Sequence, residues 1–178
     1  MYTIQSMVSF EAAHRLYAVD TYSKECSDSV HGHSYKCHIT VGRLEKNSAG
    51  MVMDFKLFKK ICKETIEDKY DHSIMLRDVD PLVPAFKQLA PEQKLNIVVD
   101  SPTAEWMAEE YCKEIEKALQ EVDEDLIVCR VAVQETENNI AAYEPVSIDF
   151  VRDSQYKIRQ QLQSQFCQEI DNGGVIPV

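Results

Sequence analysis

Two extended stretches near the N-terminus, residues 2–13 and 32–45, constrain the fold of this chain most strongly. The first is rich in β-branched and aromatic residues, and the second alternates apolar and polar side chains through Ile39 and Val41. The segment between them, residues 17–30, is polar and rich in turn-forming residues. The pattern therefore predicts two strands that pair as an antiparallel hairpin.

Two helices are predicted after this hairpin. Asp54 is a suitable N-cap for the first, which runs to about residue 70. Its apolar stripe consists of Phe55, Phe58, Ile61, Cys62 and Ile66. Residues 102–103 begin the second helix, and Glu105 lies in its first turn, where a negative charge suits the helix dipole. Residues 71–101 are rich in Pro and Asp, so we expect a long irregular link between the helices.

Two further strands complete the predicted order. Residues 126–135 and 140–150 have strand patterns and are joined by a tight Glu-Asn-Asn turn. The order β-β-α-α-β-β predicts an α+β fold, an antiparallel sheet with both helices on one face. Residues 1–150 then form one domain, and residues 151–178 form a tail that we expect to be part helix and part flexible.

Composition narrows the possible partners and the compartment. A formal net charge of −11 argues against nucleic acid or an anionic membrane surface as a partner. No apolar run approaches the length of a membrane span, and the first residues do not resemble a secretory signal. The six cysteines are scattered without a Cys-x-x-Cys pair, as expected of free thiols in a reducing cytoplasm.

Three histidines are candidates for a metal site. His31 and His33 project to the same face of the second strand, and His14 ends the first strand. Hairpin pairing would bring His14 beside the other two, and three imidazoles are a usual ligand set for catalytic zinc. His38 falls on the opposite face and is left out, while Cys37 is interpreted as a core residue.

Several other polar residues have a structural and a functional interpretation. Cys26 is either an ordinary loop cysteine or, because a bound cation nearby would lower its pKa, a nucleophile or base. Asp71 and His72 either form a solvated helix end or a proton relay.

A structural and a functional interpretation also compete for Glu135, Thr103 and Glu105. Glu135, at the end of the third strand, is either an exposed turn residue or an acceptor for the amino-pyrimidine edge of a ligand. Thr103 and Glu105 are capping residues first and ligand contacts second.

The ordered motifs FEAAH, C…HGHSY, GMVMDF, DH, PTAE and ETENN resemble a known family. The chain is similar, over about residues 1–150, to the 6-pyruvoyl-tetrahydropterin synthases and 6-carboxy-tetrahydropterin (QueD-like) synthases. This resemblance implies a tunnelling fold, in which sheets of several subunits join into a barrel. It implies a homo-oligomer, a trimer or a hexamer built on trimers, with active sites between subunits.

The resemblance also implies roles for the matching residues. His14, His31 and His33 would bind zinc, and Cys26 would abstract a proton with Asp71 and His72 as relay partners. Glu135 would anchor the pterin ring, with Thr103 and Glu105 beside it. Candidates for holding the triphosphate of the substrate, by position alone, are Arg15, Lys24 and Lys36.

The implied substrate is 7,8-dihydroneopterin triphosphate, and two products are possible. In the carboxy branch, three residues typically separate the cysteine from HGH, and in the pyruvoyl branch five; here residues 27–30 make four. A further subgroup has a glutamate three positions before the first histidine, where this chain has Asp28. We favour the carboxy reaction. The alternatives are the pyruvoyl reaction, a zinc hydrolase that does not use Cys26, and a binding protein without turnover.

Overall fold

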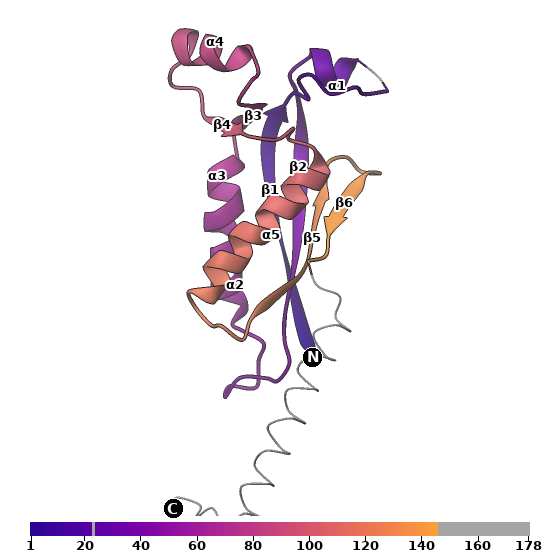
Figure 1. Cartoon of the computed structure of the whole chain (residues 1–178). Helices are drawn as coiled ribbons and strands as arrows, with labels where there is room; N and C mark the ends of the chain where they lie inside the picture. Colours follow the sequence, from indigo (N-terminus) through magenta and orange to yellow (C-terminus); the bar gives the residue numbers. More distant parts are fainter. Residues whose placement is uncertain (23, 146–178) are drawn as a thin grey trace, which may run out of the picture. The chain divides into compact units, whose positions relative to one another are not determined.

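Within residues 1–22 and 24–145, which are those that the computed structural model describes, six strands form one sheet (Figure 1). The spatial order is β4-β3-β1-β2-β5-β6. The bounds are β1 Tyr2–His14, β2 His31–Arg43, β3 Ser73–Arg77, β4 Leu95–Val98, β5 Ile127–Gln134 and β6 Ile140–Tyr143. The predicted tail, residues 151–178, and the last part of the predicted fourth strand lie outside the described residues.

The predicted hairpin is confirmed. β1 and β2 are 13 residues each and pair antiparallel along their whole length, from Tyr2 opposite Arg43 to His14 opposite His31. The connection between them contains a short helix, α1 (Glu25–Asp28), which lies at the same end of the hairpin (Figure 1). The three inward-facing histidines, His14, His31 and His33, lie at this end of the hairpin.

The two predicted helices are also confirmed. The first consists of α2 (Phe55–Cys62), a π-helical turn η1 (Lys63–Glu67) and α3 (Asp68–Tyr70), and the second is α5 (Ala104–Gln120). Asp54 accepts hydrogen bonds from the backbone of Lys56 and Leu57, as expected of an N-cap. Phe55 does not join the buried stripe, since 54% of its surface is exposed.

The core lies between the helices and one face of the sheet. Inward-facing side chains of β1 and β2 alternate with polar side chains on the other face. Cys37, Cys62 and Cys112 are buried in this core, as predicted. His38 lies on the outer face, where Gln5 is its hydrogen-bond partner at 3.3 Å.

The predicted irregular link over residues 71–101 is wrong. It contains β3, α4 (Leu82–Leu89) and β4, and both strands pair parallel, β3 to β1 and β4 to β3. These strands are only 5 and 4 residues long, too short to give a clear hydrophobic period. Their conformation depends on pairing with distant strands, β3 with β1 and β4 with β3, and the local sequence carries no signal of this pairing. The central antiparallel strands with helices on one face nevertheless match the predicted α+β class.

Among the described residues, no helix has both the length and the apolar character needed to cross a bilayer.

Candidate metal centre

The end of the β1–β2 hairpin brings three imidazoles together. His14 lies directly opposite His31 in the strand register, and His33 follows two residues along the same face of β2. One ring nitrogen from each histidine lies within 4.8 Å of the others. The ring centroids of each pair of these histidines lie 4.5 to 5.1 Å apart. The predicted convergence of the three side chains is therefore what the structure shows.

Backbone carbonyls determine which nitrogens face the centre of this cluster. Nδ1 of His14 lies 2.7 Å from the Pro102 carbonyl, and Nδ1 of His31 lies 3.1 Å from the Ser29 carbonyl. A carbonyl only accepts, so in both rings we assign the proton to Nδ1. In the neutral rings, both Nε2 atoms then carry lone pairs, and they face each other at 3.0 Å.

Burial favours the neutral form of two of the three imidazoles. Desolvation lowers the pKa of His14 from its usual 6.5 to about 4, partly offset by the Pro102 hydrogen bond, and the neighbouring imidazoles lower it further. Burial also lowers the pKa of His33, although the nearby charge of Glu135 partly offsets this effect. Burial therefore favours the neutral forms of His14 and His33, in which a ring nitrogen carries a lone pair.

These donors fit a zinc ion. Nitrogens around tetrahedral zinc lie about 3.3 Å apart, comparable with the separations in the cluster. Nε2 of His33 is buried and has no hydrogen-bond partner among the described residues, so it is available as a ligand. Metal-bound histidines commonly donate their other N–H to a backbone carbonyl, as His14 and His31 do here.

Glu135 connects the cluster to a pocket. Its Oε1 lies 3.5 Å from Nε2 of His14 and 3.7 Å from Nε2 of His33. The same residue lines a pocket of about 470 Å³ together with Thr103 and Glu105. Thr103 is also the N-cap of α5, accepting from the Trp106 N–H at 3.2 Å. The three predicted substrate-binding residues thus share one pocket beside the histidines.

Cys26 lies in α1, close in sequence to the cluster. Its carbonyl accepts a hydrogen bond from the Leu16 N–H at 2.9 Å, which ties α1 to the chain just after His14. The thiol is free and half-buried. Asp28, the alternative acidic group, lines a second pocket of about 630 Å³.

The candidate phosphate-binding residues are divided by the fold. Arg15 and Lys24 line the same pocket as Asp28, whereas Lys36 is on the outer face of β2. Arg15 is held by two hydrogen bonds to the buried Asp80, at 2.6 and 2.9 Å. Its charge is therefore already compensated within the chain.

Asp71 and His72 are held against the backbone of β1 at Glu11. Nδ1 of His72 lies 2.8 Å from Oδ2 of Asp71, and Oδ1 of Asp71 accepts from the Glu11 N–H at 2.8 Å. In the described part of the chain, no hydrogen bond or ion pair joins these two residues to the three histidines or to Glu135. Among the described residues, the printed contacts thus join the Asp71–His72 pair to β1 and not to the histidine cluster.

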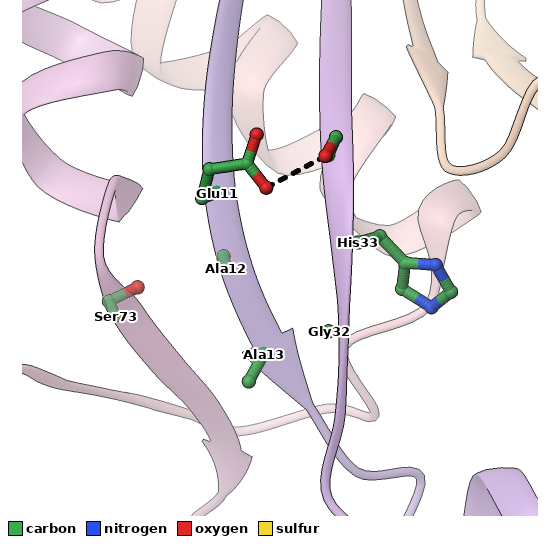
Figure 2. Close-up of a pocket in the computed structure, with 7 residues that line it drawn as sticks. Glu11, Ala12, Ala13, Gly32, His33 and Ser73 are labelled. Atoms are coloured by element: carbon green, nitrogen blue, oxygen red, sulfur yellow. Dashed lines mark hydrogen bonds between the residues drawn. The ribbon is translucent and has the colours of Figure 1, made fainter.

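A third pocket lies beside Glu11 of β1. Figure 2 shows the Glu11 carboxylate accepting from the Ser34 hydroxyl, at 2.8 Å, while the His33 ring is directed away from the pocket. The pocket is about 320 Å³ and is also lined by Gly32 and Ser73.

Some residues of the site were not predicted. The Pro102 and Ser29 carbonyls orient two histidines, and no sequence signal marks a backbone group for that purpose. The pocket beside Glu135 is also lined by Ala104 of α5, by Leu16 after β1, and by four residues that were predicted only as a turn or a strand: Asn138, Asn139, Ile140 and Ala141. The polar Glu-Asn-Asn turn could have indicated part of this pocket. Its asparagines closely follow Glu135 in the sequence, and polar residues near a candidate ligand contact are candidate pocket residues themselves.

A three-histidine cluster at the end of a long hairpin, beside a carboxylate and a pocket, on a sheet covered by helices on one face, defines a tunnelling-fold protein with a candidate metal centre. The family model described as 6-pyruvoyl tetrahydropterin synthase matches residues 3–146. The chain belongs to this family, as the sequence motifs predicted.

Relatives by sequence carry two names. The chain is 30% identical over 131 residues to a 6-carboxy-5,6,7,8-tetrahydropterin synthase of Rickettsia typhi, covering 74% of this chain and 91% of that protein. It is 32% identical over 157 residues to one of Aquifex aeolicus, covering 79% and 96%. It is 29% identical over 148 residues to the human 6-pyruvoyl tetrahydrobiopterin synthase, covering 79% and 89%.

Solved structures support the fold. An uncharacterized protein from Wolinella succinogenes superposes with a TM-score of 0.69 at 20% identity, covering 82% of this chain and 98% of that chain. The 6-pyruvoyl tetrahydropterin synthase of Caenorhabditis elegans gives a TM-score of 0.58 at 25% identity, covering 82% and 96%. The predicted tunnelling fold is thus confirmed.

Proposed function

We propose that this protein is a zinc-dependent lyase acting on 7,8-dihydroneopterin triphosphate, with 6-carboxy-5,6,7,8-tetrahydropterin, acetaldehyde and triphosphate as products. The observation that carries this proposal is the convergence of His14 and His31, whose Nε2 atoms lie 3.0 Å apart beside Glu135. Family membership and the names of the relatives support the substrate class.

His14, His31 and His33 would hold the zinc ion. When bound, zinc supplies Lewis-acid chemistry that polarises oxygens of the substrate side chain and acidifies the neighbouring C–H. Glu135 would accept hydrogen bonds from the amino-pyrimidine edge of the pterin, because its carboxylate faces both the cluster and the pocket. Thr103 and Glu105, on the same pocket wall, would contact the ring beside it.

Cys26, Asp71 and His72 would move protons. Cys26 would act as the base, and the Asp71–His72 pair would relay protons, because its imidazole is 82% exposed and its carboxylate accepts fixed hydrogen bonds. Within one chain the pair makes no described contact with the cluster. We therefore propose that a second copy of the chain supplies it, in a trimer or a hexamer built on trimers.

The two branches differ in what happens to the side chain after triphosphate leaves. In the pyruvoyl branch the side chain stays on the ring as a diketone. In the carboxy branch it is cleaved, and one water supplies the oxygen needed for a carboxylate and acetaldehyde. Relatives named for the carboxy product support this branch and the 7-deazapurine (queuosine) route, whereas the human relative supports the pyruvoyl product as the second candidate.

One experiment tests the proposal. The purified protein, loaded with zinc, is incubated with 7,8-dihydroneopterin triphosphate, and the products are identified by mass spectrometry. A carboxypterin with acetaldehyde is expected, and the His31→Ala protein serves as the control without metal. A pyruvoylpterin would select the second candidate, and unchanged substrate would contradict both.

Cys26→Ala distinguishes this reaction from zinc-dependent hydrolysis, which does not require the thiol. We expect the variant to lose turnover and to keep its zinc. Unchanged turnover would assign the chemistry to a metal-activated water instead. Retained binding of zinc and pterin without any turnover in the wild-type protein would indicate a binding protein.

The remaining parts of the proposal concern the domain, the triphosphate and the compartment. We propose residues 1–150 as the catalytic domain and a cytoplasmic location. For the triphosphate, Lys24 is favoured over Lys36 because it lines a pocket near the end of β1. Arg15 lines the same pocket, but its guanidinium is already paired with Asp80.

A further inference from the structure

The turn that carries Asp71 and His72 has an unusual backbone. His72 has a φ of +56°, in the left-handed region that residues with a Cβ rarely adopt. Such a conformation persists only where surrounding contacts hold it, and it is frequent at functional sites. The contacts around residues 70–73 therefore indicate how the imidazole is presented.

Strand β1 holds one side of this turn. The His72 N–H donates to the Glu11 carbonyl at 2.7 Å, and the Glu11 N–H donates to Oδ1 of Asp71 at 2.8 Å. The second oxygen of Asp71 faces Nδ1 of His72 at 2.8 Å. The pKa of Asp71 is lowered, first by the Glu11 N–H, then by His72 and by the ammonium group of Lys94.

Lys94, which directly precedes β4, holds the other side of the turn. Nζ of Lys94 donates to the carbonyls of Asp68, at 2.7 Å, and of Asp71, at 2.8 Å. The Asp71 carbonyl belongs to the peptide bond that directly precedes His72. Lys94 therefore fixes the plane of the peptide on which the unusual φ of His72 depends.

Asn96, in β4, also hydrogen-bonds to residues on either side of the turn. Its Nδ2 donates to the Lys69 carbonyl at 3.1 Å and to the Ser73 hydroxyl at 2.9 Å, and that hydroxyl donates to the Tyr70 carbonyl at 2.6 Å. Ile74 pairs with Leu95 in the parallel ladder, so the side chains of Lys94 and Asn96, on either side of Leu95, lie beside the turn. The turn is thus clamped between the backbone of β1 and two side chains of the β4 segment.

We propose that Lys94, supported by Asn96, is a positioning residue that fixes the orientation of the His72 imidazole for proton transfer. The catalytic part of this inference rests on the proposed function, which makes His72 a proton relay. Lys94 lies in the segment that sequence patterns indicated to be an irregular link. It would act through the Asp71–His72 peptide, without touching substrate or metal.

Kinetics of three variants test the effect on turnover. Lys94→Met keeps the aliphatic stem and removes the donors, Lys94→Arg restores donors, and Lys87→Met is a matched control at an exposed position on α4. We expect Lys94→Met to lower kcat by roughly tenfold to a hundredfold with KM and zinc content unchanged, because misplaced proton-transfer groups slow chemistry rather than binding. Lys94→Arg should recover most of kcat, and Lys87→Met should match wild type.

Ring nitrogen NMR of His72 tests the orientation without any substrate. In wild type the Asp71 contact should hold the proton on Nδ1, giving two distinct 15N signals. Lys94→Met should move these signals toward the average of the two tautomers, whereas Lys87→Met should not. This measurement decides the positioning role even if the wild-type protein turns over no pterin, an outcome that would contradict only the proposed function.

Two results would overturn the inference. One is an unchanged His72 spectrum in Lys94→Met. The other is an active wild-type protein in which Lys94→Met lowers only the melting temperature and leaves kcat as it was, which would give Lys94 a structural role alone.

Discussion

Nε2 of His14 and Nε2 of His31 lie 3.0 Å apart, although the residues are 17 positions apart in the chain. Both rings donate their Nδ1 protons to backbone carbonyls, so two lone pairs face each other. Two acceptors at this distance repel unless a cation lies between them or one ring is protonated. Burial lowers the pKa of His14 to about 4, so at neutral pH its Nε2 keeps a lone pair that a metal ion can accept.

The first prediction follows from this pair. His31→Ala removes one of three ligands, and zinc affinity should fall by more than about 100-fold, the upper end of what outer contacts to a metal site contribute. Isothermal titration and metal analysis measure this. His38→Ala, on the outer face of the same strand, is the control and should keep full affinity. Full zinc occupancy in His31→Ala would exclude the proposed ligand set.

The second prediction concerns Glu135. Glu135→Gln keeps the shape of the side chain and removes the charge that accepts hydrogen bonds from a pterin edge. Charge-assisted bonds contribute about 1.5–3 kcal/mol, so the Kd for a non-reactive pterin should rise about 10- to 150-fold. Fluorescence titration measures the Kd. Glu137→Gln, in the same turn, should bind like wild type, and equal losses in both variants would contradict a specific role for Glu135.

The third prediction is a pH dependence of the metal-free protein. His14 has a folded-state pKa of about 4 against 6.5 when unfolded, so the unfolded chain binds the proton first as pH falls. Stability should be intact above pH 6.5 and decline between 6.5 and about 4, by up to about 3 kcal/mol from this group. Urea unfolding of chelator-treated protein at several pH values measures the effect.

A variant separates His14 from the other titrating groups. His14→Asn should flatten the decline over this pH range, whereas His38→Asn should keep the wild-type slope. The same slope in wild type and His14→Asn would show that His14 does not carry a strongly lowered pKa.

The fourth prediction concerns Tyr35, which lies beneath the cluster with its ring centroid 5.4 Å from that of His33. Its hydroxyl is buried and has no hydrogen-bond partner among the described residues. Tyr35→Phe should therefore leave the free energy of unfolding unchanged or raise it by about 1 kcal/mol. Tyr70→Phe is the comparison, since the Tyr70 hydroxyl donates to Glu114 at 3.4 Å and its loss should cost up to about 1 kcal/mol. A clear loss of stability in Tyr35→Phe would reveal a hydroxyl partner.

Elements with a long hydrophobic period were predictable from the sequence. The alternation through Ile39 and Val41 gave β2, and the capping residues Asp54 and Thr103 gave the starts of α2 and α5. The short strands β3 and β4 were not predictable, because a strand of 4 or 5 residues gains its stability from its neighbours rather than from its own pattern. The clamp of Lys94 on the Asp71 carbonyl was hidden for the same reason.

For the site, residue types and strand periodicity were enough to group His14, His31 and His33, since the register of a long hairpin is set by which face is buried. The ordered motifs were enough to recognise the family. The tautomers of His14 and His31, the place of Glu135 between cluster and pocket, and the contacts that hold Asp71 and His72 against β1 became visible only in three dimensions. These features depend on backbone carbonyls and on contacts between segments far apart in the chain, and neither is encoded in the identity or spacing of neighbouring residues.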